Sequence, residues 1–383
     1  MPTPAHPRPL VVFADDWGRH PSSAQHLVRQ LLPTRSVAWV NTIGTRPPRL
    51  DRQTLRRVAG KLRSWTRPRP DAVPDAAPSP SVLNPKMWPS FASPLARRLN
   101  RSLLVRCLTP VFDALPAPPV VVTTLPLVAD LVGRIPAAKW VYYCVDDFSV
   151  WPGYDGATML RMERDLVPKV DRAVAVSNTL VEHLAMLGRP AELLTHGVDL
   201  AHWHSAPDAS SLPEFAGLPP PWVLFWGVVD RRLDLDFIRH LSAHPAAGSV
   251  VMVGPSEDPD PALFGIPRVF VRPAVPYARL PALARAAAVL VMPYADAPVT
   301  RAMQPLKMKE YLATGRPCVV RALPSTRPWA DCLDVAETPA GFAALVAERL
   351  TSGVPASQTA ARGRLAAEGW AAKAAAFAGV LDD

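Results

Sequence analysis

Residues 304–320 read QPLKMKEYLATGRPCVV and combine a helical pattern, a turn and an apolar strand. Pro305 suits the first turn of a helix, and Gly315 followed by Pro317 predicts the end of that helix about ten residues later. Residues 318–320 are apolar and predict a short buried strand. This succession of helix and strand is typical of a parallel sheet covered by helices.

The start of the predicted helix is a candidate site for a phosphate group. Free N–H groups and the positive end of the helix dipole at residues 304–306 would attract an anion, and Lys307 would add a full positive charge. Glu310, one turn further along, would accept hydrogen bonds from sugar hydroxyls. The alternative interpretation of this pattern is an ordinary amphipathic helix with a capped end.

The length and composition predict two domains and a reducing environment. A chain of 383 residues exceeds the size at which one core usually stops growing, so we expect two domains of roughly 180 to 200 residues. Hydrophobic residues make up 49% of the chain, enough for two cores. The four cysteines have no Cys-x-x-Cys spacing, which argues against a zinc site or a disulfide framework.

The charge distribution suggests a membrane surface as a partner. Residues 1–9 lack the apolar segment of a secretory signal, and no apolar run reaches the roughly 18 residues that cross a bilayer, so we expect a cytoplasmic protein. The formal net charge is +9, and residues 43–110 hold 14 Lys or Arg against three Asp. RNA-binding and zinc-finger signatures are absent, so we expect no nucleic-acid partner.

The segment around residues 95–108 predicts a helix on this basic surface. Leucines fall near one face of it and arginines mostly around the other, as in a helix that lies at a membrane interface. The leucines are Leu95, Leu99, Leu103 and Leu108. The alternative interpretation is a helix that is buried on one side and has a solvated basic face.

The first half of the chain alternates short apolar runs with helical patterns, which predicts a parallel sheet wrapped by helices. The expected strands are 10–13, 37–43, 120–123, 140–145, 173–176 and 192–195. Residues 66–94 contain eight prolines and predict a long irregular loop. The turn at residues 196–199, HGVD, is expected to form a hinge.

The second half repeats this alternation, which predicts a second doubly wound domain. The expected strands are 222–226, 249–253, 269–271, 289–292 and 318–320. An alanine-rich helical tail would pack back across the domains. We therefore predict an N-terminal domain at 1–200, a C-terminal domain at 201–365 and a crossing helix at 366–383. Two such open sheets facing one another would bind ligands in a cleft at the carboxyl ends of their strands.

The best candidate for a catalytic base follows the predicted strand 140–145. That strand would deliver Asp146 and Asp147 at its carboxyl end, before the aromatic residues of loop 148–154. Asp146 could take a proton from an acceptor hydroxyl if the site keeps it within hydrogen-bond reach. We expect Asp147 to cap the following turn.

The loop after the first strand is a second candidate. Gly18 would let the backbone approach a ligand closely, and Arg19 and His20 would contact a phosphate of the acceptor or the donor; we assign all three to the acceptor side. Ser22 or Ser23 would cap the helix that follows. A purely structural loop is an equally open interpretation.

The loops after two strands of the second half offer further donor contacts. Gly227, with Arg231 or Arg232, would meet a diphosphate, and Gly254 lies where base or ribose contacts are expected. Residues 234–236 match the Asp-x-Asp spacing of some metal sites, but they open a predicted helix, where acids serve as caps. We therefore predict no metal site. Neither a Gly-x-Gly-x-x-Gly helix start nor a Walker loop is present, which argues against a dehydrogenase.

Taken together, these features resemble the GT-B glycosyltransferases over nearly the whole chain. The resemblance rests on the twin α/β halves, the turn 196–199, and Pro305, Lys307 and Glu310 followed by Gly315. It implies two Rossmann-like domains that face each other across a cleft, with the nucleotide sugar bound by the second. The second half is similar to bacterial family 4-type transferases, which implies donor contacts from Gln304, Pro305, Leu306, Lys307 and Glu310.

One position departs from the family 4 pattern. That pattern has two glutamates, and the place of the first is taken by Ala302, so the usual contact to the transferred sugar is missing. A lysine with a single acidic residue instead resembles exopolysaccharide transferases such as the xanthan glucuronosyltransferase, in which an aspartate after a Val-Tyr pair acts as base. Val141, Tyr142 and Asp146 match that arrangement. Teichuronic-acid-type transferases are similar around residues 146–147 and 307–317.

The resemblance implies an enzyme of the hexosyltransferase class at the inner face of the cell membrane. It would move a sugar from a nucleotide diphosphate donor to a lipid-linked or oligosaccharide acceptor in bacterial surface or exopolysaccharide biosynthesis. No cofactor is expected. Two alternatives remain open at this point: a nucleotide-sugar 2-epimerase of the same architecture, and a non-catalytic scaffold for polysaccharide assembly.

Overall fold

The structure is a computed structural model that describes residues 7–19, 22–42, 78–205 and 212–383. The chain divides into two compact units. The first comprises residues 1–176, 180–194 and 374–383, and the second comprises residues 177–179 and 195–373. The domain limits derived from the sequence, 1–200, 201–365 and 366–383, stay predictions.

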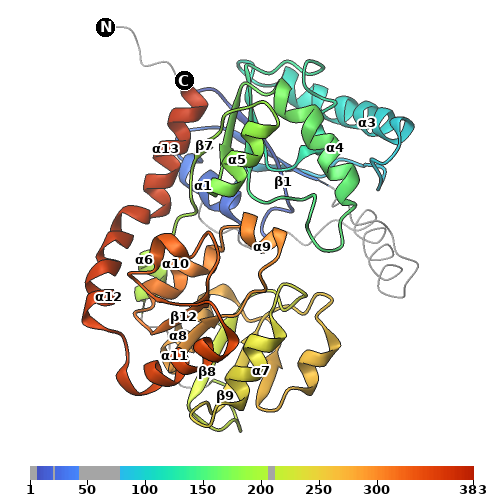
Figure 1. The fold of residues 1–383 in the computed structure, drawn as a ribbon. Helices are drawn as coiled ribbons and strands as arrows, with labels where there is room; N and C mark the ends of the chain where they lie inside the picture. Colours follow the sequence, from blue (N-terminus) through green and yellow to red (C-terminus); the bar gives the residue numbers. More distant parts are fainter. Residues whose placement is uncertain (1–6, 20–21, 43–77, 206–211) are drawn as a thin grey trace, which may run out of the picture. The chain divides into compact units, whose positions relative to one another are not determined.

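The first unit is built on a parallel sheet of seven strands with helices packed around it (Figure 1). Its order is β3-β2-β1-β4-β5-β6-β7. The strands are β1 (Leu10–Ala14), β2 (Val37–Asn41), β3 (Ser81–Leu83), β4 (Val120–Thr123), β5 (Lys139–Cys144), β6 (Arg172–Ala175) and β7 (Glu192–Leu193). The helices are α1 (Ser23–Leu31), α3 (Pro94–Asp113), α4 (Gly156–Leu166) and α5 (Asn178–Met186). The chain reverses its direction through the sheet between β1 and β4, and ligands bind such sheets at a reversal of this kind.

The second unit has a parallel sheet of six strands in the order β10-β9-β8-β11-β12-β13. The strands are β8 (Trp222–Trp226), β9 (Ser249–Val253), β10 (Val269–Arg272), β11 (Val289–Met292), β12 (Cys318–Arg321) and β13 (Asp334–Ala336). The helices are α6 (Leu200–His204), α7 (Leu235–Ala243), α8 (Leu280–Ala286), α9 (Pro298–Ala302), α10 (Leu306–Ala313), α11 (Pro339–Ser352) and α12 (Ala356–Ala361). The last helix, α13 (Trp370–Asp382), begins in this unit and ends in the first. Here the reversal lies between β8 and β11.

Both sheets form because their strands are apolar on both faces, as strands covered by helices on each side must be. Four central strands, β1, β4, β8 and β9, are buried at nearly every position. Helices α7 and α11 cover the second sheet, where the rings of Phe237 and Phe342 meet at 5.3 Å. Helix α13 continues past the end of the second unit at residue 373 into the first, where Phe377 packs on Tyr143 at 5.3 Å.

The structure adds two strands that the sequence analysis did not predict. Residues 66–94 were expected to be an irregular loop, but Ser81–Leu83 forms β3, which pairs with β2 at the edge of the sheet. Three residues flanked by Pro80 and Pro85 carry no apolar pattern, and only their pairing with β2 makes them a strand. Strand β13 is equally short and pairs with β12. Residues 66–77 of the predicted loop lie outside the described residues.

The exposed face of α3 also differs from the predicted one. Leu108 is fully buried, whereas Leu95 is 80% exposed and Leu99 is 44% exposed. The four leucines therefore do not share one face. The core is instead reached by Leu104 and Leu108, because Leu95 and Leu99 lie on the opposite side of the helix cylinder. None of the helices in the described ranges is long and apolar enough to cross a bilayer.

Candidate functional site

The strongest candidate site lies at the chain reversal of the second sheet. Strands β8 and β11 pair with each other, and the chain leaves them toward opposite edges. Gly227 directly follows β8, and Tyr294 follows β11 after one proline. In open parallel sheets, this position at the carboxyl ends of the strands is where ligands bind.

Lys307 occupies this position. It lies in the first turn of α10, and its Nζ donates a hydrogen bond to Tyr294 Oη at 2.6 Å. The same ammonium group lies 4.3 Å from the ring centroid of Phe225, the strand residue before Trp226. A Cβ atom on Gly227 would come within 1.9 Å of Lys307 Nζ. The glycine therefore leaves room for the ammonium group at the strand end.

Gly254 lets the end of the next strand pack closely against Gly227. It follows β9, and a Cβ there would lie 1.9 Å from the carbonyl oxygen of Gly227. Gly227 also has φ of +135°, a region that other residues rarely adopt. Two strand ends thus pack backbone against backbone beside Lys307.

The start of α10 lies beside Lys307, and its role as an anion site stays a prediction. The helix begins at Leu306, and Pro305 in the N-cap position makes no side-chain capping bond. Gln304 is 9% exposed, and its Oε1 accepts a hydrogen bond from the backbone N–H of His196 at 2.6 Å, while its donor contact stays a prediction. It thereby anchors the turn 196–199 to the start of α10, and the hinge role of that turn stays a prediction.

Glu310 lies in an aromatic pocket that the sequence did not reveal. Its Oε1 accepts from the hydroxyl of Tyr277 at 3.0 Å, and its Oε2 accepts from the indole N–H of Trp226 at 3.4 Å. Trp203 stacks on Trp226 with ring centroids 5.2 Å apart, and His202 stacks on Tyr277 at 4.1 Å. Burial raises the pKa of Glu310, against the effect of these two donors. Contacts to sugar hydroxyls would use the lone pairs that remain.

The two arginines after β8, Arg231 and Arg232, differ in burial and in their partners. Arg231 has a side chain that is 53% exposed and pairs with Asp258 at 3.2 Å. Arg232 is 8% exposed, pairs with Asp230 at 2.8 Å, and places its guanidinium 5.8 Å from the ring of Tyr294, the hydroxyl partner of Lys307. Two cations, Lys307 and Arg232, therefore lie near the ring of Tyr294.

The Asp-x-Asp pattern acts as a helix cap, as expected. Asp234 Oδ1 accepts from the backbone N–H groups of Asp236 and Phe237 at the start of α7, and Oδ2 pairs with Arg321. Within the described part of the chain, no group of three or more His, Cys, Asp or Glu side chains is arranged to hold a metal ion.

In the first unit, β5 delivers the predicted base at its carboxyl end. Asp146 is half-buried, two residues after the last residue of the strand. Asp147 caps the following turn as expected, because its Oδ1 accepts from the N–H and the hydroxyl of Ser149 at 2.9 and 2.5 Å. In the aromatic loop that follows Asp147, the ring centroids of Phe148 and Trp151 are 6.3 Å apart. The two carboxylates thus have different environments.

Behind the base lies a buried polar cluster that the sequence did not indicate. Glu163 of α4 is 3% exposed and accepts from Tyr142 Oη at 2.7 Å, and His183 Nε2 lies 2.7 Å from its other oxygen. The hydrogen bond to Glu163 raises the pKa of His183. These residues come from three elements, so their proximity depends on the fold.

The loop after β1 also lies at the carboxyl ends of the strands of the first sheet, where β4 separates β1 from β5. Gly18 has φ of +75° and donates its N–H to Gln25 Oε1 at 3.1 Å. The side chain of Arg19 is 67% exposed and lies 3.7 Å from Asp16. Ser22 caps α1, as one of the two predicted serines. The third acceptor-side candidate, His20, lies outside the described residues.

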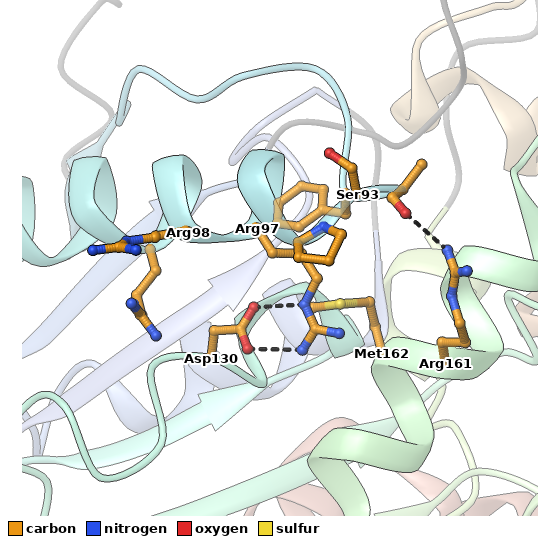
Figure 2. Close-up of a pocket in the computed structure, with 10 residues that line it drawn as sticks. Ser93, Arg97, Arg98, Asp130, Arg161 and Met162 are labelled. Atoms are coloured by element: carbon orange, nitrogen blue, oxygen red, sulfur yellow. Dashed lines mark hydrogen bonds and ion pairs between the residues drawn. The ribbon is translucent and has the colours of Figure 1, made fainter.

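A basic cavity of 410 Å³ opens beside the start of α3 (Figure 2). It is lined by Phe91, Ala92, Ser93, Pro94, Arg97, Arg98, Arg101, Asp130, Arg161 and Met162. Figure 2 shows Arg97 paired through two hydrogen bonds with Asp130, at 2.7 and 2.8 Å. This pairing holds the pKa of Asp130 below its usual range. Arg98 and Arg101 form no ion pair with any residue that the structure describes, so the cavity keeps an excess of positive charge.

No protein-family model matches the sequence, and no curated protein is significantly similar to it. Solved structures are similar in fold. Sucrose-phosphate synthase from Thermosynechococcus elongatus has a TM-score of 0.71 and 16% identity, covering 97% of this chain and 98% of that chain. Anabaena HepE in complex with UDP-glucose has a TM-score of 0.62 and 12% identity, with 98% and 96% covered.

A third structure, an α,α-trehalose 6-phosphate synthase from Burkholderia multivorans, has a TM-score of 0.60 and 14% identity, covering 98% of each chain. All three similarities span essentially the full length of both chains. The chain therefore has the GT-B fold, with two parallel sheets and alternating helices.

Proposed function

We propose that the protein is a glycosyltransferase of the hexosyltransferase class that uses a nucleotide diphosphate sugar as donor. The observation that carries this proposal is the position of the Lys307 ammonium group, at the chain reversal of the second sheet, between Gly227 and Tyr294. The similarity in fold to HepE, which was solved in complex with UDP-glucose, supports the same donor class. The acceptor is a lipid-linked or oligosaccharide hydroxyl in bacterial surface or exopolysaccharide assembly.

The second unit binds the donor in this proposal. The diphosphate lies beside Gly227 and Gly254 and accepts hydrogen bonds from the N–H groups at the start of α10. Lys307 stabilises the negative charge that develops on the leaving diphosphate, with Arg232 as a second cation at the Tyr294 ring. In other transferases a bound metal stabilises the charge of the leaving diphosphate. Here these groups do so, and the proposal includes no cofactor.

Asp146 of the first unit is the base. The acceptor hydroxyl oxygen forms the bond to the anomeric carbon, and the bond from that carbon to the diphosphate oxygen breaks. The nucleoside diphosphate leaves with the electron pair, and the hydroxyl proton passes to the carboxylate of Asp146. Gly18, Arg19 and His20 contact the acceptor side.

The proposal is tested by measuring nucleoside diphosphate release from a panel of nucleotide sugars. We expect release with one donor only when a bacterial membrane lipid extract or an oligosaccharide is added. Conversion of the donor alone into a second nucleotide sugar would identify a 2-epimerase instead. Consumption of none of the donors, with or without acceptor, would leave a non-catalytic scaffold.

We further propose that a membrane surface presents the acceptor to the first unit. On α3, Leu95 and Leu99 are exposed beside Arg98, and the cavity with Arg101 opens next to them. Apolar side chains flanked by arginines bind an anionic interface, where each arginine contributes about 1 kcal/mol. The basic segment 43–77 that contributed to this prediction lies outside the described residues.

Replacing Arg98 and Arg101 together by glutamate is expected to weaken binding to vesicles containing anionic phospholipid by about 10-fold or more. Co-sedimentation at low and high salt measures the effect. The control is Arg327→Glu, which reverses the charge of an arginine in the second unit whose side chain is 70% exposed. Equal binding of both variants, or equal binding to neutral and anionic vesicles, would contradict this surface.

A further inference from the structure

The chain passes between its two units at residues 176–180, at 194–195 and at 373–374. Three crossing segments are therefore defined within the second unit: residues 177–179, 195–198 and 368–373. All three form hydrogen bonds with one stretch of the same unit, residues 301–310, which we name the donor segment. This stretch contains the end of α9 and the first half of α10.

The first crossing segment bonds to the end of α9. Ser177 Oγ donates to the carbonyl oxygen of Ala302 at 2.5 Å, and Thr179 Oγ1 donates to that of Arg301 at 3.3 Å. Ala302 is the position where the resembling family carries a glutamate, and here its backbone has a structural partner. The second crossing segment bonds to Gln304 through the N–H of His196.

Lys309 joins the second and third crossing segments. Its side chain is 2% exposed, and its Nζ donates to Thr195 Oγ1 at 3.1 Å and also to the carbonyl oxygen of His196 and the carboxylate of Glu368. Lys373 shares the same carboxylate at 2.7 Å. One buried lysine on α10 thus holds both segments at a single point.

Backbone contacts complete this junction. The N–H of Val198 donates to the carbonyl oxygen of Glu368 at 2.9 Å, and Val198 forms a parallel bridge with Gly369. The ring of Trp370 lies so close to Gly197 that a Cβ there would meet it at 2.7 Å. The two segments therefore pack directly on each other, and Lys309 attaches the pair to α10.

Burying the ammonium group of Lys309 at this junction is unfavourable in free energy. Burial of a charged group is unfavourable unless it is paired, and an apolar side chain often serves stability as well as a buried ion pair does. Burial lowers the pKa of Lys309 to about 8, although Glu368 opposes the shift. The directional bonds of the ammonium group specify one arrangement of the segments, which an apolar side chain would not.

We propose that Lys309 is a positioning residue that couples the donor segment to the crossing segments, so that Lys307 and the other donor groups of α10 are held in one position. This inference rests on the proposed function. Lys307 and Lys309 lie on different sides of α10, one bonded to Tyr294 and the other to Thr195 and Glu368. A rigid helical turn between them transmits the position of the crossing segments to the donor lysine.

The test is Lys309→Met, which keeps an unbranched side chain one atom shorter than lysine and removes its three donors. We expect kcat to fall by about 10- to 100-fold, as for small misplacements of reacting groups. The Kd of the nucleoside diphosphate, measured by calorimetry, is expected to change by less than about 3-fold because Lys307 remains. Glu368→Gln should act in the same direction, and the double variant should lose less than the sum of the two single effects on the free-energy scale.

The matched control is Arg349→Met. Arg349 forms a buried ion pair with Asp334 at 2.6 Å on α11, away from the donor and crossing segments. We expect a lower Tm and an unchanged kcat for this control. A Lys309→Met variant that lowers Tm in the same way and leaves kcat unchanged would overturn the proposal, as would additive effects in the double variant.

Hydrogen exchange separates this inference from the proposed function. In Lys309→Met, amide exchange is expected to rise together in residues 195–198 and 301–306, whereas Arg349→Met leaves both unchanged. If the wild-type protein turns over no donor, the proposed function fails, and the coupling is still decided by this exchange pattern. Exchange that rises in only one of the two stretches would contradict the coupling. If Lys309→Met fails to fold, Glu368→Gln provides the same comparison.

Discussion

Replacing Asp146 by asparagine is expected to lower the turnover of sugar transfer by about 10²- to 10⁴-fold, the usual contribution of a general base. The amide keeps the shape of the side chain but does not take the acceptor proton. The Kd of the nucleoside diphosphate is expected to stay unchanged, because the donor groups belong to the second unit. Steady-state kinetics with donor and acceptor, together with calorimetry, measure both quantities.

The control for this variant is Asp171→Asn. Asp171 Oδ2 accepts from the backbone N–H of Trp140 at 2.7 Å, at the start of the same strand whose end precedes Asp146. Its replacement removes a carboxylate from the opposite end of β5 and is expected to affect stability only. An Asp146→Asn enzyme with the turnover of the wild type would eliminate Asp146 as the base.

Replacing Lys307 by methionine is expected to have the second largest effect. Methionine preserves an apolar stem against Phe225 and removes the charge that neutralises the leaving diphosphate. A hydrogen bond to a charged group contributes about 1.5–3 kcal/mol, so kcat/KM for the donor should fall by about 10- to 100-fold or more. Because the charge grows in the transition state, kcat should fall as well as donor affinity.

Gly227→Ala provides an independent test of the same contact. The new Cβ would meet Lys307 Nζ at 1.9 Å and displace the ammonium group from the strand end. We expect a smaller loss of kcat/KM in the same direction. Unchanged kcat/KM in both variants would show that the ammonium group does not contact the diphosphate.

The parts of the fold that could be predicted from the sequence are the buried strands. Strands β4, β8, β9 and β11 begin and end at the predicted residues, because each is a mostly apolar run between polar or proline-containing turns. Strands β3 and β13 have only three residues each and depend on a neighbouring strand for their existence. The exposed side of α3 could not be predicted either, because leucine at a helical interval does not specify which side meets the core.

Only the parts of the candidate site that depend on local sequence could be predicted. The start of α10, Lys307 and the two glycines follow from local pattern, since each lies directly beside a strand or helix end. Tyr294, Trp226, Tyr277 and Glu368 were missed because they approach residues 307–310 from separate elements, and no local pattern records such contacts. The preference for Arg232 over Arg231 likewise depends on which side chain turns inward after β8.

Titration calorimetry of the wild-type protein with nucleoside diphosphates tests the central claim most directly, because it asks whether the second unit holds a nucleotide at the chain reversal of its sheet. We predict that one nucleoside diphosphate binds with a stoichiometry of one and that Lys307→Met weakens it by about 10-fold or more, whereas Arg349→Met does not. The absence of binding by every nucleoside diphosphate, or equal binding by the Lys307→Met protein, would contradict the account.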